Sequence, residues 1–245
     1  LHGYYTPHKL IIENQDKLSS VVIHVSTDLS LKAGFQLGVP KLKHFSANPQ
    51  WEKQVTKMAD KVIWIGLDKI PLHDEIDIID IPNYYEFENN LQCNDSNVVG
   101  FAARCETRKS PHYLDGIKSM AFTDTKDWNW WRAHYKCMFE DTRLYQFNYK
   151  NIHRFYRRQD WGISHSCHLN EPFGYSIFQA FDYGKLPILQ MDWLKDFEYP
   201  FRAFTKEQFK HQVNNISELS IQERNDYLDG FREYLRQYDN KQEWT

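Results

Sequence analysis

Short apolar runs separated by polar stretches dominate the first half of the chain and predict buried β-strands. Residues 21–25, 61–65 and 76–81 are rich in Val and Ile, whose branched side chains fit the faces of a sheet. Residues 50–59 have helical character, and Pro82-Asn83 ends the third run because proline lacks the N–H that a ladder needs. Strand, helix and strand in this order predict an α/β domain with parallel pairing.

A polar and acidic stretch at residues 84–97 interrupts this pattern and is the candidate linker. A second α/β set follows, and apolar residues at helical spacing predict two helices between residues 206 and 238. The other expected elements are strands at 98–102, 144–147, 161–164 and 186–189, a helix at 112–121, and a helix that starts after Gly174. We therefore expect an N-terminal domain over residues 1–90 and a C-terminal domain over residues 91–245.

Length and composition are those of a folded globular protein. Of 245 residues, 41% are hydrophobic and 26% are charged, which excludes a disordered chain. The net charge of -3 provides no overall attraction for nucleic acid or anionic membranes. No apolar run approaches the roughly 18 residues of a membrane span, so stable membrane insertion is not expected. Abundant Lys, Asn, Ile, Tyr and Phe with only 10 Gly are typical of AT-rich genomes, including those of phages and viruses.

The cysteines indicate a reducing, cytoplasmic environment. Four cysteines lie far apart and form no Cys-x-x-Cys pair, so a disulfide framework is not expected. His165, Cys167 and His168 crowd together near a predicted strand end, but no second pair of ligands follows at zinc-finger spacing. We prefer ordinary packing at the strand end to a metal site, and expect no bound metal.

The run Glu171-Pro172-Phe173-Gly174-Tyr175 leads into a predicted helix and suits an anionic ligand. A glycine before a helix lets a phosphate approach the amides of the first turn, where the helix dipole favours negative charge. Glu171 in the loop and Gln179 in the helix are placed to flank one ligand. In the alternative interpretation the run is a plain loop-to-helix turn, with Glu171 at the surface and Gln179 at the edge of the core.

A second motif, Arg104-Cys105-Glu106-Thr107-Arg108-Lys109, comes directly after a predicted strand. Open α/β sheets bind their ligands at the carboxyl ends of their strands. Arg104 offers a planar fork and Lys109 a mobile point charge, so both cations suit a diphosphate. The alternative is a solvated basic loop.

These two motifs together resemble the GT-B glycosyltransferases, in particular the large retaining group with a Glu-x7-Glu signature. Residues 171–188 are similar to the E-x-F-G-x4-E-A run of that family, and residues 104–109 to its Arg-x4-Lys diphosphate clamp. Ala59-Asp60-Lys61-Val62-Ile63 resembles a strand of the first domain, and Ile81-Pro82-Asn83 the approach to the linker between domains. The resemblance implies an α/β fold of two Rossmann-like domains.

The resemblance also implies site residues for a nucleoside diphosphate sugar, with no metal and no other cofactor. The implied catalytic residues are His24 and Glu171, and the implied donor-binding residues are Arg104, Lys109, Phe173, Gly174, Tyr175 and Gln179. His24 follows Val22-Ile23 near a strand end that faces the cleft in such folds. A packed, hydrogen-bonded polar residue is the alternative role for His24.

The chain departs from the family in three places. Gln179 replaces the second Glu of the signature, which retains hydrogen bonding to a ribose but removes a charge. Phe-Ala-Ala separates Gly100 from Arg104, where the family has Arg directly. The opening Leu1-His2-Gly3-Tyr4 resembles the middle of the acceptor domain, with His2 or Tyr4 at a functional position, and nothing matches the first Gly-rich turn. We therefore expect the N-terminal domain to be incomplete in this chain.

A cluster of arginines, Arg154, Arg157 and Arg158, is interleaved with aromatic residues. On a helix these side chains fall within about one turn of each other, which suits phosphate contacts. A solvated helix face is one interpretation of the cluster, and contact with an acceptor or with nucleic acid is the other.

Transfer of a sugar from a nucleoside diphosphate sugar is the function that these motifs favour, with retention of the anomeric configuration implied by the family. Cations and helix-end amides can stabilise the leaving diphosphate, and the lack of an Asp-x-Asp motif agrees with metal independence. The acceptor is a carbohydrate or modified DNA. Two alternatives are a non-catalytic module that binds nucleotide sugars and an unrelated Rossmann-like phosphate binder. A glycosidase fits less well because no carboxylate pair stands out.

Overall fold

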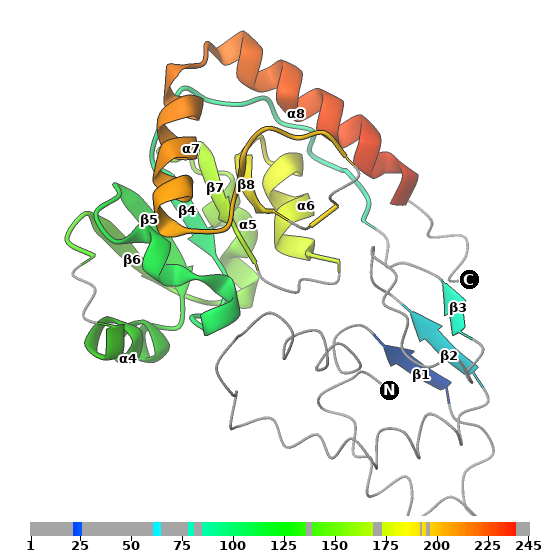
Figure 1. Cartoon of the computed structure of the whole chain (residues 1–245), viewed down its shortest axis with the longest axis horizontal. Helices are drawn as coiled ribbons and strands as arrows, with labels where there is room; N and C mark the ends of the chain where they lie inside the picture. Colours follow the sequence, from blue (N-terminus) through cyan, green and yellow to red (C-terminus); the bar gives the residue numbers. More distant parts are fainter. Residues whose placement is uncertain are drawn as a thin grey trace, which may run out of the picture. The chain divides into compact units, whose positions relative to one another are not determined.

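A computed structural model describes 155 of the 245 residues, and the chain divides into two compact units (Figure 1). Unit 1 comprises residues 1–84, 170–173 and 240–245, and unit 2 comprises residues 85–169 and 174–239. The described residues are 22–25, 61–64, 78–80, 85–135, 139–168, 173–191, 193–194 and 197–238. Among them, no helix has the length and apolar character that crossing a membrane requires.

Unit 1 contains three parallel strands in the order β1-β2-β3. These strands are β1 (Val22–Val25), β2 (Lys61–Trp64) and β3 (Ile78–Asp80). They confirm the strands predicted from the Val- and Ile-rich runs. The helix expected at residues 50–59 lies outside the described residues.

Unit 2 is built on a sheet of six parallel strands in the order β6-β5-β4-β7-β8-β9 (Figure 1). The chain starts at the centre, moves outward through β5 to β6, returns to place β7 beside β4, and moves outward again through β8 to β9. This order is that of the doubly wound Rossmann sheet. The strands are β4 (Val99–Ala102), β5 (Ser119–Thr123), β6 (Thr142–Gln146), β7 (Ile163–Ser166), β8 (Leu186–Gln190) and β9 (Arg202–Ala203).

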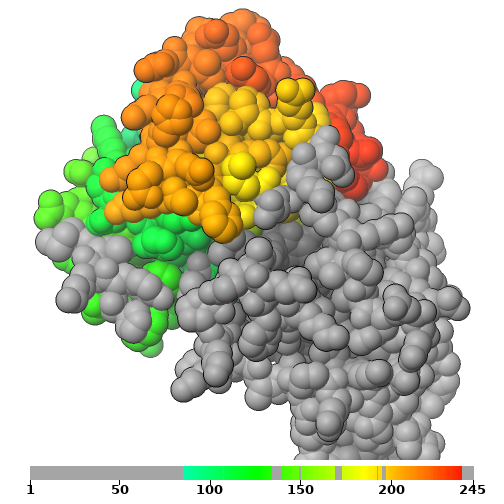
Figure 2. Space-filling model, in the orientation of Figure 1, coloured from blue at the N-terminus to red at the C-terminus, as the bar shows by residue number. Residues whose placement is uncertain are grey.

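Helices connect these strands and continue after the last one. Capping boxes fix the starts of the final two helices: Thr205 accepts from the Gln208 amide at 3.2 Å, and Ser220 from the Glu223 amide at 3.3 Å. These two helices form much of the outer surface on the side that Figure 2 shows. The helices are α4 (Thr125–Tyr135), α5 (Ile152–Tyr156), α6 (Tyr175–Asp182), α7 (Lys206–Glu218) and α8 (Ile221–Leu235), with short 3-10 turns η4 (Thr107–Lys109), η5 (Pro111–Leu114), η6 (Tyr149–Asn151) and η7 (Arg236–Tyr238).

The centre of the sheet is buried on both faces. Every residue of β5, β7 and β8 is buried, whereas the edge strand β6 is only partly covered. Gly100 lies against the ring of Trp161, where an added Cβ would come within 2.1 Å of a ring carbon. Trp161 in turn donates its indole N–H to Phe155 O at 2.9 Å. The sheet therefore admits only glycine at position 100 without displacing the Trp161 ring.

The helix expected at residues 112–121 is wrong. The chain instead makes the 3-10 turn η5, passes through Gly116 with φ of 73°, and enters β5 at Ser119. Because β5 lies between two strands and is buried on both faces, its apolar run lacks the alternation that identifies a half-exposed strand. Helix α4 was also not predicted from the sequence. In this helix Trp128 and Trp131 are buried one turn apart.

The irregular segment 85–97, expected as a linker, runs alongside α8 before it enters β4 (Figure 1). Cys93 N donates to Asn225 Oδ1 at 2.7 Å, and Arg232 donates to Leu91 O. Gly184 approaches so closely that an added Cβ would lie 2.2 Å from Gln92 O. This segment is therefore an integral part of unit 2.

A buried carboxylate fixes the start of the same segment. Asp182, at the end of α6, accepts from Asn89 N at 2.9 Å, Asn89 Nδ2 at 2.8 Å and Asn90 N at 2.8 Å. The Tyr85 hydroxyl adds a longer bond of 3.2 Å. Because α6 ends shortly before β8 begins, this network lies at the amino edge of the sheet.

Candidate functional site

The two motifs found in the sequence follow the two central strands of unit 2. Strands β4 and β7 are parallel neighbours, with Val99 paired to Ile163 and Gly100 to Ser164. The clamp loop (residues 103–110) follows β4. The connection from β7 to α6, here called the signature loop, is described at residues 167–168 and 173–174. From this pair the connections lead to β5 on one side and to β8 on the other. The loops thus leave the sheet at its topological switch point, where doubly wound folds bind their ligands.

Contacts within unit 2 hold the clamp loop in one conformation. Trp131 donates its indole N–H to Cys105 O at 2.9 Å, and the Thr123 hydroxyl lies 3.5 Å from Cys105 Sγ. The Arg108 guanidinium pairs with Glu106 at 2.9 Å, and Lys109 N donates to Glu106 O at the same distance. A loop fixed in this way presents its polar groups in a defined geometry.

Lys109 joins the clamp loop to the residues that follow β7. Its side chain is buried, at 8% exposure, and its Nζ lies 3.3 Å from Nδ1 of His168, which is itself 2% exposed. Burial, followed by the charge of Lys109, holds the pKa of His168 well below its usual value. The imidazole is therefore neutral, and because an ammonium only donates, Nδ1 accepts and Nε2 carries the ring proton.

A second histidine joins the same two loops. Nε2 of His165 lies 2.9 Å from Ser110 O, and Nδ1 lies 3.3 Å from the Cys167 amide. Since Nδ1 accepts from an amide, Nε2 carries the proton and donates to Ser110. Burial lowers the pKa of His165 to about 4. Ser110 has a positive φ of 48°, a strained conformation for a serine, and this contact helps to hold it.

The signature loop ends in a helix start that lacks a side-chain cap. Gly174 is the N-cap of α6, with φ of 83° and ψ of 54°, a left-handed conformation that favours glycine. Gly174 O accepts from Ile177 N at 2.7 Å and from Phe178 N at 3.2 Å. Amides of the first turn and the positive end of the helix dipole therefore lie at the carboxyl edge of the sheet, in the arrangement that suits an anion.

The other predicted donor-binding residues are placed as follows. Arg104 lies in the clamp loop with an exposed side chain, and Tyr175 is 49% exposed at the start of α6. Gln179 is partly buried within α6, one turn beyond the start, and Phe173 is buried.

The side chains of the two predicted catalytic residues lie outside the described part of the chain. His24 lies in β1, paired in register with Ile63, but its side chain is outside the described part of the chain. Glu171 lies wholly outside the described residues. The roles of both remain predictions.

The sequence favoured ordinary packing of His165 and His168 at the strand end over a zinc site, but their contacts with the clamp loop were not predicted. The one signal available was the presence of two histidines at the end of a strand in a chain with a buried central sheet. Within the described ranges there is no group of three or more His, Cys, Asp or Glu side chains that could hold a metal ion.

Two of the three clustered arginines, Arg157 and Arg158, make side-chain contacts within unit 2. Helix α5 ends at Tyr156, so Arg157 and Arg158 lie beyond it. Arg158 pairs with Asp160 at 2.5 Å and lies 5.0 Å over the Tyr145 ring, while Arg157 donates to Asn89 Oδ1 at 3.2 Å. These contacts favour a structural role for the cluster over a phosphate-binding one.

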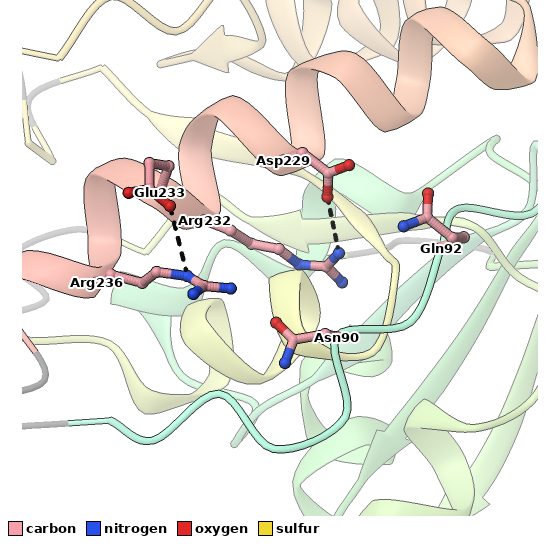
Figure 3. A pocket seen from close by; sticks show the side chains of 6 residues that line it. All are labelled: Asn90, Gln92, Asp229, Arg232, Glu233 and Arg236. Carbon is pink, nitrogen blue, oxygen red and sulfur yellow. Dashed lines mark hydrogen bonds and ion pairs between the residues drawn. The ribbon is translucent and has the colours of Figure 1, made fainter.

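A hollow of about 190 Å³ lies at the opposite edge of the sheet from the two loops (Figure 3). Asn90 and Gln92 from the irregular segment and four residues of the α8 end line it. Its charged residues pair with each other, Arg232 with Asp229 at 3.1 Å and Arg236 with Glu233 at 3.7 Å. The hollow therefore belongs to the amino-edge network and not to the candidate site.

Comparison with known proteins shows the fold. No protein-family model matches the sequence, and no curated protein is significantly similar to it. A substituted form of Staphylococcus aureus TarM, in complex with fondaparinux, α-GlcNAc-glycerol and UDP, aligns with a TM-score of 0.59 at 12% identity over 93% of this chain and 55% of that chain. A second TarM structure aligns with a TM-score of 0.54 at 12% identity over 94% of this chain and 54% of that chain.

This chain thus spans about half the length of the two TarM structures. At 12% identity the likeness establishes the fold alone. The fold is the α/β, Rossmann-like GT-B architecture, as the sequence predicted.

Proposed function

We propose that this protein binds a nucleoside diphosphate sugar and transfers the sugar to an acceptor hydroxyl. The observation that carries the proposal is the position of Lys109. A buried ammonium lies at the switch point of a Rossmann sheet, on a loop tied to the strand end that leads into the α6 N-terminus. The GT-B fold and the UDP bound in one TarM structure support a nucleotide as the ligand.

The reaction requires groups that stabilise the negative charge that develops on the leaving diphosphate. When the bond between sugar C1 and the diphosphate oxygen breaks, charge develops on that oxygen. The Lys109 ammonium, with Arg104 on the same loop, would stabilise this charge together with the amides that follow Gly174. A new bond then forms from C1 to the acceptor oxygen, whose proton leaves to a base. Retention of configuration and independence of metal are parts of this proposal, as are the catalytic roles of His24 and Glu171.

A carbohydrate is the acceptor that we favour. One TarM structure is a complex with UDP and α-GlcNAc-glycerol, and α-GlcNAc-glycerol is a sugar joined to a polyol. In unit 2, two of the three arginines that suggested a nucleic-acid contact bind within the chain: Arg158 pairs with Asp160, and Arg157 donates to Asn89.

The second candidate is a module that binds nucleotide sugars without catalysis. Gln179, in place of the second signature Glu, is the observation that favours it. Release of free nucleoside diphosphate from a donor sugar in the presence of acceptor supports the enzyme. Donor binding without turnover, across a panel of carbohydrate acceptors, supports the module.

Binding of UDP and of uridine, measured by calorimetry, tests the phosphate contact. Lys109→Met keeps the length of the buried side chain and removes its charge. Hydrogen bonds to a charged group contribute about 1.5–3 kcal/mol, so UDP affinity should fall about 10- to 100-fold while uridine affinity stays the same. Lys118→Met, at an exposed site, is the matched control and should change neither affinity.

Equal losses for the two ligands would mean that Lys109 supports the fold and does not contact phosphate. If the unchanged protein binds no UDP, a thermal-shift screen of other nucleoside diphosphates decides the matter, because a ligand at 100 times its Kd stabilises by about 2.7 kcal/mol. A screen in which no nucleotide stabilises the protein would refute the proposed function.

A further inference from the structure

We propose that His168 is a positioning residue for Lys109, holding its ammonium at the phosphate site from the opposite loop. This inference rests on the proposed function and names a residue that the two sequence motifs do not include. The two side chains come from residues 59 positions apart, on the loops that follow β4 and β7, and meet at 3.3 Å.

A lysine side chain gains most from being held in place before its ligand arrives. Ordering a free lysine costs side-chain entropy, and a ligand that must order it binds correspondingly more weakly. Lys109 and His168 are both buried, at 8% and 2% exposure, so their contact orders the ammonium within the folded protein. The donor then meets a cation whose position is already set.

The backbone around His168 fixes the imidazole in turn. His168 N donates to Ser166 O at 2.8 Å, which forms a tight turn directly after β7. Three positions before His168, His165 joins the same strand end to Ser110 O at 2.9 Å. The clamp loop and the end of β7 are therefore joined twice, once through each histidine, and Lys109 Nζ sits at one of these junctions.

The charge state of His168 suits an acceptor. Among the described residues, Lys109, His165 and Arg108 act electrostatically on His168, and each favours the neutral ring. A protonated ring would place a second cation beside the Lys109 ammonium and remove the acceptor at Nδ1. The neutral ring instead accepts from the Lys109 ammonium without adding a second positive charge beside it.

The test compares two replacements of His168 that have similar size, of which only one has an atom that can accept a hydrogen bond from Lys109. His168→Asn places an amide oxygen near the position of Nδ1 and should keep UDP affinity within about threefold. His168→Leu removes the acceptor and should weaken UDP about tenfold, or about 1.4 kcal/mol, with uridine affinity unchanged. His211→Leu, at an exposed site on α7, is the matched control.

A double-mutant cycle distinguishes positioning from a separate contribution to binding. If His168 acts through Lys109, Lys109→Met combined with His168→Leu should bind UDP no more weakly than Lys109→Met alone. Additive losses, or an equal loss of uridine and UDP affinity in His168→Leu, would overturn the proposal. If His168→Leu does not fold, His168→Gln replaces it, because its amide extends toward the Nε2 position, and it should lose UDP affinity where His168→Asn keeps it.

UDP binding by the unchanged protein tests the proposed function, and UDP binding by the His168 variants tests the positioning role. If the unchanged protein binds no nucleoside diphosphate, the proposed function and the positioning role fall together. The coupling between Lys109 and His168 in urea unfolding would still report their contact. If the protein binds UDP and both His168 variants bind it equally well, the proposed function stands and the positioning role is refuted.

Discussion

The two edges of the unit 2 sheet both bury polar groups, but they use them differently. At the amino edge, Asp182 accepts several hydrogen bonds from Asn89 and Asn90, and Arg232 donates to Phe181 O. At the carboxyl edge, Lys109 meets a neutral histidine beside the start of α6. The first edge is a network in which opposite charges and their partners all come from the chain itself. The second gathers donors and positive charge, which suits an anion that comes from outside.

This difference separates a buried charge that holds the fold from a buried charge that is a candidate for ligand binding. A buried carboxylate surrounded by backbone and side-chain donors is explained by the fold that it holds. A buried ammonium that contacts an uncharged ring, at the switch point of a doubly wound sheet, is a candidate for binding. Substitutions at the two edges should therefore differ in their effect on the ligand. At the amino edge stability should change and ligand affinity should not, whereas at Lys109 ligand affinity should fall.

The largest effect is expected at the amino edge. Asp182→Ala removes the charged acceptor of three hydrogen bonds from Asn89 and Asn90, which should lower the free energy of unfolding by about 3–5 kcal/mol. UDP affinity of the folded fraction should stay the same. Urea unfolding with UDP titration measures both, and Asp226→Ala, at an exposed position, is the control. A UDP affinity that falls with the Asp182 change would contradict the separation of the two edges.

A pH dependence of stability is expected at the carboxyl edge. Burial gives His165 a folded-state pKa of about 4, below its usual 6.5, so the unfolded chain binds more protons between these values. The free energy of unfolding should therefore fall as the pH is lowered from 6.5 to 4, by about 3 kcal/mol from this group.

His165→Gln isolates that contribution, because its amide can still donate to Ser110 O and does not titrate. The difference in unfolding free energy between the variant and the unchanged protein should change across this pH range. Parallel pH profiles for the two proteins would show that His165 does not carry the effect.

The smallest effect concerns Gln179 on α6. A Gln amide can hold a ribose with one accepting and one donating group, and a Glu carboxylate can accept from both ribose hydroxyls. Gln179→Glu should bind UDP as well as the unchanged protein or better, and Gln179→Ala should weaken it by about 1 kcal/mol. Calorimetry on the three forms measures the change. If the alanine variant binds as tightly as the unchanged protein, the ribose contact lies elsewhere and Gln179 serves the helix.

Local pattern was enough for many of the elements. Runs of Val and Ile predicted β1, β2 and β3, and apolar residues at helical spacing predicted α7 and α8, whose starts are set by Thr205 and Ser220. The glycine before α6 was also identified correctly, because a left-handed residue at a helix start favours glycine. Each of these features depends on residues within a few positions of one another.

The α/β class, most strands and the two motifs at strand ends follow from local sequence alone. Which of these residues meet depends on the tertiary structure. Residues 119–123 became β5 because neighbours on both sides buried them, which no local periodicity records. Lys109 meets His168, and Asp182 meets Asn89, across 59 and 93 positions because the strand order brings their segments together. Side-chain contacts of this kind depend on the arrangement of the whole sheet, since a hydrogen bond between distant residues exists only after the chain between them has folded.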